Sequence, residues 1–393
     1  MRIAISGAGV AGPTLAYWLC RAGHQPTLIE TAPQLRTGGY VIDFWGLGYQ
    51  VAQRMGLEPV IRELGYQVQS IRSVGCDGNI KASLDVDAFT RATHGRYTSL
   101  PRGDLAAAIY AAIEHDVETV FGDSITAINE HADGVSLSFA EGTTRDFDLV
   151  IGADGLHSNV RRLTFGAELK AEYYLGCMVA AYVVDAYRPR DELLYVTHSM
   201  PGRSVGRFSL RDDRTLILLV FRSDRLDVPD DISGRKSLLC SVFSNDRWEC
   251  PAMLAALDEV NDLYMDVVSQ VRLDRWSRGR TALVGDAAAC VSLLAGEGTG
   301  LAMTEAYVLA GELVCADGDY RRAFDAYEER LRSFVDDKQT GARSFVSVFA
   351  TKSRLGIAFR NLMMRTMNSL PWVADMFVAR SLTDNLMLPE YPM

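Results

Sequence analysis

The first thirty residues set the pattern on which the chain is organised. Residues 2–6 form a short apolar run typical of a buried parallel strand, and a glycine-rich turn follows. The apolar positions within residues 15–19 have helical spacing, and a second apolar run at 26–29 ends at Glu30. This order of strand, turn, helix and strand predicts a dinucleotide-binding βαβ unit.

The rest of the chain shows strand patterns first and helical patterns near its end. Residues 320–349 carry apolar positions at helical spacing and predict a long helix. A last helical segment, 355–378, is interrupted by charges and a proline, so we do not expect it to span a bilayer. Six stretches have the composition of strands separated by turns: 68–74, 80–84, 173–185, 192–199, 205–210 and 214–221.

These patterns predict an α/β fold in which one domain interrupts another. A Rossmann-like domain is assembled from separate segments, a mostly antiparallel β-sheet domain is inserted into it, and helices close the chain. We expect the Rossmann-like domain at 1–66, 97–170 and 276–345, the inserted substrate domain at 67–96 and 171–275, and a C-terminal helical segment bridging both at 346–393.

The glycine-rich turn has the spacing G-x-G-x-x-G. Its first glycine permits a tight turn, its second lets the backbone approach a pyrophosphate, and its third lets the helix pack close to the strand. The acid that ends the second strand can accept hydrogen bonds from a ribose. The motif alone does not separate FAD from NAD. The residues expected at the dinucleotide are Gly7, Gly9, Val10, Ala11, Gly12 and Glu30.

Two distant segments carry further candidate cofactor residues. An apolar strand at 147–152 runs into the turn Asp154-Gly155, and another strand ends in Gly285-Asp286. An aspartate at such a strand end can bond a ribityl hydroxyl, and the N-terminus of the following helix can polarise a flavin pyrimidine ring. The loop that leads into this helix contributes Gly296, Gly298, Thr299 and Gly300.

With these motifs near residues 7, 154 and 286, the chain resembles the group A FAD-dependent monooxygenases of the para-hydroxybenzoate hydroxylase-like fold. It is most similar to the branch that contains the tetracycline-inactivating monooxygenases. That branch carries a glycine-rich loop like residues 38–43 and an arginine that opens a helix, as Arg102 does here. The resemblance implies an FAD-binding domain of the GR2 type.

The resemblance also implies roles for individual residues. Arg102 and Asp286 would contact the flavin half of FAD, and Asp154 would serve a motif shared by FAD and the reduced nicotinamide. Arg36 and Asp43 would flank a mobile flavin loop. The chain departs from the family at Ala289 and Leu293, where a histidine and a proline are common, so the local shape of the flavin pocket is an open question.

The activity implied is oxygen insertion with NADPH or NADH and O2 as cosubstrates. A flavin C4a-hydroperoxide would transfer one oxygen atom to a small organic substrate, aromatic or polycyclic, with hydroxylation as the default and epoxidation or Baeyer–Villiger insertion open. No catalytic side chain is needed, because the cofactor carries the chemistry. Because a second G-x-G-x-x-G is absent from the sequence, we expect NAD(P)H to dock transiently.

Candidates for the substrate wall come from the predicted sheet. Two of them alternate on one strand face, and an arginine on a neighbouring strand is comparable to a substrate arginine of the tetracycline-inactivating relatives. The methionines and phenylalanines of 355–378 are interpreted as helix packing rather than a cavity lid. The substrate candidates are Met178, Tyr182, Arg207 and Phe221.

Composition narrows the possible partners. The 393 residues include 40 basic and 50 acidic side chains, a net charge of −10, which disfavours nucleic acid and anionic membranes as partners. The seven cysteines form no C-x-x-C pair and no metal-ligand cluster, which is typical of reduced residues in a cytoplasmic protein. We expect no bound metal, and a monomer or a homodimer.

Three other functions were weighed against oxygen insertion. An FAD-dependent reductase or dehydrogenase on the same fold stays open as the alternative. A flavin halogenase is disfavoured because the sequence has no Trp-x-Trp-x-Ile-Pro segment. A non-enzymatic carrier is disfavoured because it has no need for a loop that addresses the reactive ring.

Overall fold

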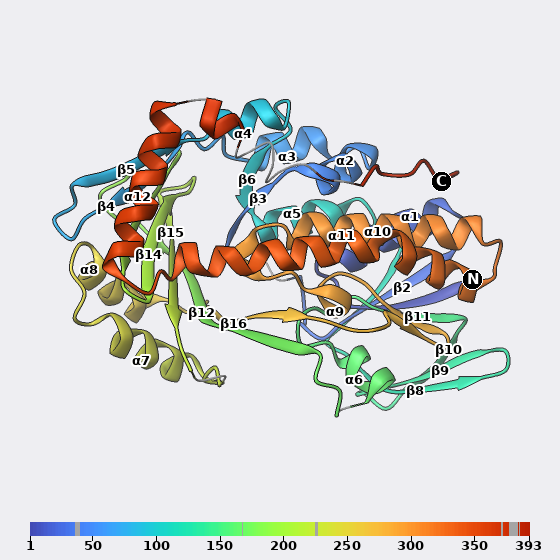
Figure 1. Ribbon diagram of the computed structural model, residues 1–393. Helices are drawn as coiled ribbons and strands as arrows, with labels where there is room; N and C mark the ends of the chain where they lie inside the picture. The colour runs from blue at the N-terminus through green and yellow to red at the C-terminus, as the bar shows by residue number, and fades with distance from the viewer. Residues whose placement is uncertain (36–39, 167, 225–226, 371, 377–383, 385) are drawn as a thin grey trace.

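The computed structural model describes residues 1–35, 40–166, 168–224, 227–370, 372–376, 384 and 386–393. Arg36, a predicted cofactor residue, lies outside the described residues, as do Gly38 and Gly39. Figure 1 shows an elongated molecule with one sheet at each end and a long helix running between them. The predicted α/β fold class is confirmed.

In the described chain, the first sheet has the strand order β17-β18-β11-β1-β2-β7. Its strands pair in parallel except for β17, which runs antiparallel to β18. Ile3 and Ile5 of β1 are fully buried because elements cover both faces, which explains the continuous apolar run. The strands are β1 (Arg2–Ser6), β2 (Gln25–Glu30), β7 (Glu118–Phe121), β11 (Leu149–Gly152), β17 (Ser277–Arg278) and β18 (Thr281–Leu283).

Helices surround this sheet, and two small sheets extend it. α1 packs against α10, and α10 in turn packs against α2. The helices are α1 (Ala11–Arg21), α2 (Gly46–Arg54), α3 (Glu58–Leu64), α5 (Arg102–Ala111), α6 (Asn159–Phe165), α9 (Asp286–Ala289), the 3-10 turn η2 (Leu293–Ala295) and α10 (Gly298–Cys315). The small sheets are β3 (Val41–Phe44) with β6 (Thr98–Pro101), and β8 (Ile125–His131), β9 (Gly134–Phe139) and β10 (Thr144–Phe147).

The second large sheet joins the predicted strands in the order β16-β12-β15-β14-β13-β4-β5. It is antiparallel apart from the β13–β4 pair, and β16 is a strand that the sequence patterns did not predict. Its strands are β4 (Ser70–Val74), β5 (Ile80–Asp85), β12 (Glu172–Asp185), β13 (Leu194–Met200), β14 (Arg203–Ser209), β15 (Arg214–Arg222) and β16 (Tyr264–Val271).

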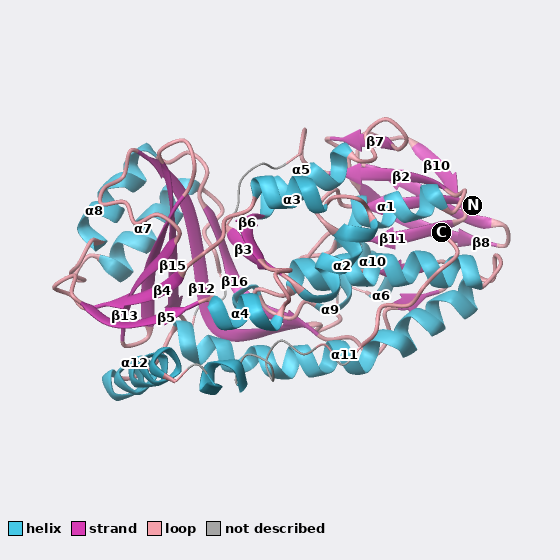
Figure 2. Ribbon diagram, turned by 90° about the horizontal axis from the view of Figure 1, so that it is seen from above, coloured by secondary structure: helices cyan, strands magenta, loops and turns pink. Residues whose placement is uncertain are grey.

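The two faces of this sheet have different surroundings. One face, here called the outer face, carries Tyr182 and Ile217 and packs against α7 and α8. The other, the inner face, carries Ala181 and Phe208 and packs against residues next to β3 and β6. Figure 2 shows α7 and α8 on the far side of the sheet from the first domain. The remaining small elements are α4 (Asp87–Ala92), α7 (Ile232–Phe243), α8 (Cys250–Ala256) and the 3-10 turn η1 (Leu257–Glu259).

The C-terminal helices connect the two ends of the molecule (Figure 1). α11 (Tyr320–Phe349) has the bounds that the sequence predicts, and α12 (Arg354–Ser369) packs against β5 and β13. The tail then returns to the first domain, where Tyr391 donates a hydrogen bond to Glu312 at 2.6 Å. The segment therefore contacts both ends of the molecule, while the exact domain boundaries stay a prediction.

Candidate functional site

The first glycine-rich turn has the close contacts that its spacing predicts. Gly7 has a φ of +107°, and a Cβ there would run into the backbone of Ala153. A Cβ on Gly12 would overlap the carbonyl oxygen of Gly7, so α1 packs directly on the turn. Val10 and Ala11 lead into α1, whose first N–H groups are free to bind an anion.

Glu30 fixes the end of β2 beside this turn. Its Oε2 accepts a hydrogen bond from the N–H of Ala8 at 2.8 Å, and its Oε1 accepts one from the N–H of Ala32 at 2.9 Å. These bonds place a carboxylate next to the glycine turn, where the sequence predicts a ribose contact. The contact itself stays a prediction.

Arg102 lies above the second glycine of the turn. A Cβ on Gly9 would lie 3.7 Å from its guanidinium Nη2 atom. The Arg102 backbone N–H, at the start of α5, donates to the carbonyl of Tyr40 at 3.0 Å. Within the described part of the chain its guanidinium makes no ion pair with a carboxylate. A half-buried cation beside a glycine turn can therefore take up a negatively charged ligand.

Asp286 approaches the same place from the other side. Gly285 adopts a φ of +64°, and a Cβ there would sit 3.2 Å from the Ala11 Cβ atom. A Cβ on Gly298 would lie 3.6 Å from Asp286 Oδ1, so this carboxylate borders the start of α10. Burial raises the pKa of Asp286, and the positive charge of Arg102 opposes that rise.

Two tyrosines complete this cluster. The rings of Tyr40 and Tyr264 are 5.5 Å apart at a tilt of 50°. Burial raises the pKa of Tyr40 to about 12, and the charges of Arg102 and Asp286 both act on it. Tyr264 belongs to β16 of the second sheet, so the cluster joins the two domains. Neither tyrosine was predicted as a site residue: Tyr40 lies in the glycine-rich loop 38–43, and no motif marks Tyr264.

The loop before α10 packs against the start of α2. A Cβ on Gly48 would overlap the backbone of Gly300, and a Cβ on Gly296 would lie 3.9 Å from the Trp45 ring. Thr299 lies buried in the first turn of α10. The loop can thus present backbone N–H groups only while these two helices stay in close contact.

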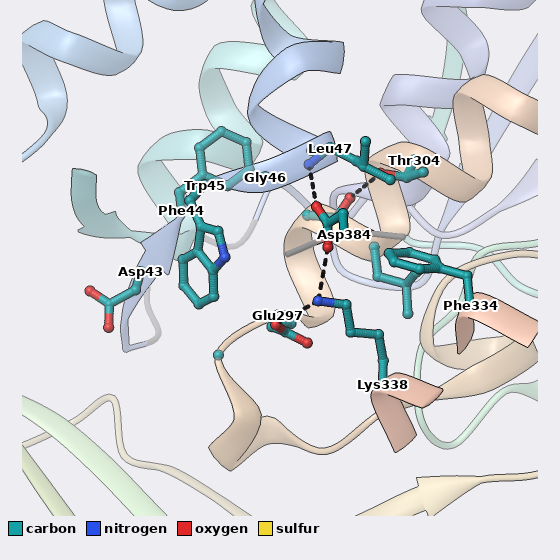
Figure 3. Close-up of a pocket in the computed structure, with 14 residues that line it drawn as sticks. Asp43, Phe44, Trp45, Gly46, Leu47, Glu297, Thr304, Phe334, Lys338 and Asp384 are labelled. Atoms are coloured by element: carbon teal, nitrogen blue, oxygen red, sulfur yellow. Dashed lines mark hydrogen bonds and ion pairs between the residues drawn. The ribbon is translucent and has the colours of Figure 1, made fainter. Parts of the chain in front are cut away.

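A pocket lies beside this loop (Figure 3). Lys338 of α11 forms ion pairs of 2.9 Å with both Glu297 and Asp384. Asp384 in turn accepts a hydrogen bond from the N–H of Leu47 at 3.2 Å. These three charged residues were missed from the sequence, since they are far apart in the chain; Glu297 lies in the predicted glycine-rich loop, but Lys338 and Asp384 belong to no motif.

The carboxylates of Asp43 and Asp154 accept hydrogen bonds from other residues of the protein. Asp43 accepts hydrogen bonds from the hydroxyls of Tyr97 and Ser99, and burial raises its pKa in spite of them. Asp154 accepts from the Ser158 hydroxyl at 2.5 Å and from the Val160 N–H at 3.0 Å. The two hydrogen bonds to Asp154 fix the start of α6, which is a structural role. Contact of either aspartate with the cofactor stays a prediction.

The four predicted substrate residues lie on the outer face of the second sheet, away from the Asp286 cluster. Met178 is buried there, the Tyr182 hydroxyl donates to the carbonyl of Met253 at 2.8 Å, and the Phe221 ring packs edge-on against Phe243. Two neighbouring acids hold Arg207 by ion pairs of 2.6 and 2.8 Å.

This position does not favour the four residues as the substrate wall, and their contact with substrate stays a prediction. Alternation along a strand tells which residues share a face but not which face points to the cofactor. The inner face carries the neighbouring positions. Ala181 pairs with both Tyr264 and Leu218, Leu218 pairs with Gly206, and Gly206 pairs with Thr197. We call these five residues the inner row.

Comparisons with known proteins agree with this geometry. The FAD binding domain family matches residues 1–339. A flavin-dependent monooxygenase of Legionella longbeachae is 35% identical over 86% of this chain and 87% of its own length. An uncharacterised protein of Mycobacterium tuberculosis is 38% identical over 86% of this chain and 91% of its own length. The crystal structure of the tetracycline destructase Tet(55) superposes with a TM-score of 0.85, at 31% identity over 99% of this chain and 98% of that one.

The chain belongs to the FAD-binding monooxygenase family and is an oxidoreductase. The residues present fit FAD. Gly7 and Gly12 leave no room for side chains, a cation without an acidic partner in the described chain lies above Gly9, and a carboxylate lies at the start of α10. No helix of the described residues has the length and apolar content that crossing a membrane requires.

Proposed function

We propose that this enzyme uses NADPH or NADH and O2 to insert one oxygen atom into a small aromatic or polycyclic compound, most simply by hydroxylation. The balance is one NAD(P)H, one O2 and one proton consumed for one hydroxylated product, one NAD(P)⁺ and one water. The observation that carries the proposal is the meeting of three sequence-distant segments: the glycine turn at residues 7–12, Arg102 at the start of α5, and Asp286.

In this proposal the first domain holds FAD. The N–H groups at the start of α1 and the guanidinium of Arg102 face the pyrophosphate, and Asp286 accepts hydrogen bonds from the ribityl chain. The positive end of α10 stabilises negative charge on the flavin pyrimidine ring. When bound, FAD supplies the redox and oxygen chemistry, so the side chains need only bind, orient and exclude water.

We also propose that the substrate binds against the inner row. Tyr264 connects this row to Tyr40 and so to the cofactor residues. Leu218 and Thr197 are half-buried although they lie in the middle of a seven-stranded sheet, which supports a ligand surface there. Of the residues between them, Ala181 carries only a methyl group and Gly206 carries no side chain.

An Asp286→Ala variant tests the cofactor part of the proposal. We expect FAD affinity to fall at least about tenfold, because a charged hydrogen-bond acceptor is lost. Titration of apoprotein with FAD, followed by quenching of flavin fluorescence, measures the change. Asp274→Ala, at an exposed position, is the control and should bind FAD normally. Equal FAD affinity in the two variants would reject the role of Asp286.

A further inference from the structure

Arg360 of α12 is a cation whose partners are all neutral. Its Nη2 donates to the Ser199 hydroxyl at 2.9 Å and its Nη1 to the carbonyl of Val348 at 2.8 Å. Its Nε atom is buried and has no hydrogen-bond partner among the residues the structure describes. Burial lowers the pKa of Arg360, and no acidic group acts against that shift. A partly buried charge without a counterion is costly unless a ligand supplies one.

Arg360 lies on the inward side of helix α12, the side that also carries the buried Met367. The residue after Arg360, Asn361, has an Oδ1 atom that is also buried without a partner in the described chain. On the opposite side Leu355, Phe359 and Leu362 are 84%, 65% and 58% exposed. Packing alone would favour the reverse arrangement, with apolar side chains inside. The inward position of Arg360 therefore calls for a polar occupant.

Capping of α11 explains only part of this arrangement. Val348 lies in the last turn of α11, and Arg222 also donates to a carbonyl there, that of Ala350, at 2.8 Å. Such contacts suit a cation, but the C-terminal end of a helix carries only about half a negative charge. The unpartnered edge of Arg360 and the amide of Asn361 are not accounted for by capping.

The location of Arg360 links it to the inner row. Ser199, which binds Arg360, lies two residues from Thr197 on the same strand and therefore on the same face. Tyr264 at the other end of the row is four strand spacings away, or about 19 Å at the usual separation of strands. Figure 2 shows α12 at the β4–β5 end of the sheet, beside the end of α11.

We propose that Arg360 binds an oxyanion of the substrate, so that this enzyme acts on an elongated organic anion. The carboxylate or enolate lies at the α12 end of the inner row, and the carbon to be oxidised lies at the Tyr264 end. This inference rests on the proposed function and specifies its substrate class.

Direct binding tests the inference without any turnover. The probes are 1-pyrenebutyrate and its neutral primary amide, titrated with FAD-loaded enzyme and followed by pyrene fluorescence anisotropy. We expect the acid to bind about tenfold or more tightly than the amide, as a charge-assisted hydrogen bond provides. Arg360→Met should abolish that preference, and Arg360→Lys should retain part of it.

Arg365→Met is the matched control on the same helix, since Arg365 is exposed and donates only to the carbonyl of Lys81. It should keep the full preference for the acid. Equal binding of acid and amide, no binding of either, or a preference that survives Arg360→Met would overturn the inference. Failure of the proposed function is seen separately, as absence of FAD binding or of oxygenated product, and does not alter this readout.

Discussion

At the scale of single residues, buried acids differ in whether their charge is compensated. Asp286 faces Arg102, whereas Glu305 in the middle of α10 is fully buried and has one oxygen without a partner in the described chain. The other Glu305 oxygen accepts the N–H of Gly285 at 2.5 Å. Burial raises the pKa of Glu305 well above its usual range, which favours its neutral form, and its hydrogen bond holds the Gly285 turn.

Substitutions at Glu305 should separate its charge from its hydrogen bond. Because the pKa is raised in the folded state, wild-type stability falls as pH rises above about 4.5, the ordinary value. Glu305→Gln keeps an acceptor and should be more stable than wild type at pH 8, with a smaller advantage at pH 5. Urea unfolding at both pH values measures this. Glu305→Leu should instead lose FAD affinity, and identical behaviour of the two variants would contradict the assignment.

His157 also makes the stability of the protein depend on pH, but its pKa is raised by hydrogen bonds to acids and not by burial. It lies 3.2 Å from Asp266 and 3.4 Å from Glu172, and hydrogen bonds to these acids raise its pKa to about 10. The stabilisation is complete below the ordinary pKa of 6.5 and is lost as pH rises through about 10. The melting temperature should therefore exceed that of His157→Gln at pH 6 by more than at pH 10. An equal difference in melting temperature at the two pH values would show that His157 is not charged beside Asp266 and Glu172.

At the scale of elements, close contact between α2 and α10 shapes the loop that addresses the flavin. The glycines at 48 and 300 touch across the two helices, and Lys338 with Asp384 holds the same region from outside. The contact combines apolar burial with the missing side chains of these glycines. We therefore expect the packing of α2 on α10 to affect cofactor binding.

A Gly48→Ala variant should force these helices apart. The added Cβ meets backbone atoms, which cannot move aside as a flexible side chain would. We expect FAD affinity and the melting temperature both to fall. Gly341→Ala in α11 is the control, since a Cβ there meets nothing within 4 Å, and it should gain about 0.5–1 kcal/mol of stability. Unchanged FAD affinity in Gly48→Ala would contradict the coupling.

At the scale of the whole molecule, the sequence predicts the parts with local signals and misses those that depend on assembly. The glycine turns, α11 and most strands of the second sheet follow from spacing and alternation. The substrate face does not, because alternation leaves two equivalent choices, and Arg207 lies on the face that is turned away from the Asp286 cluster. Lys338 and Asp384 meet only after the chain has folded back on itself.

The central claim is that the enzyme uses electrons from NADPH or NADH to transfer one oxygen atom from O2 to an organic compound. Isotopically labelled O2 with NADPH and a panel of aromatic and polycyclic acids tests it, with mass spectrometry of the products. The account predicts that one compound accelerates NADPH oxidation and gains one labelled oxygen atom per NADPH consumed. NADPH oxidation that yields no labelled product with any compound would contradict it and favour an FAD-dependent reductase.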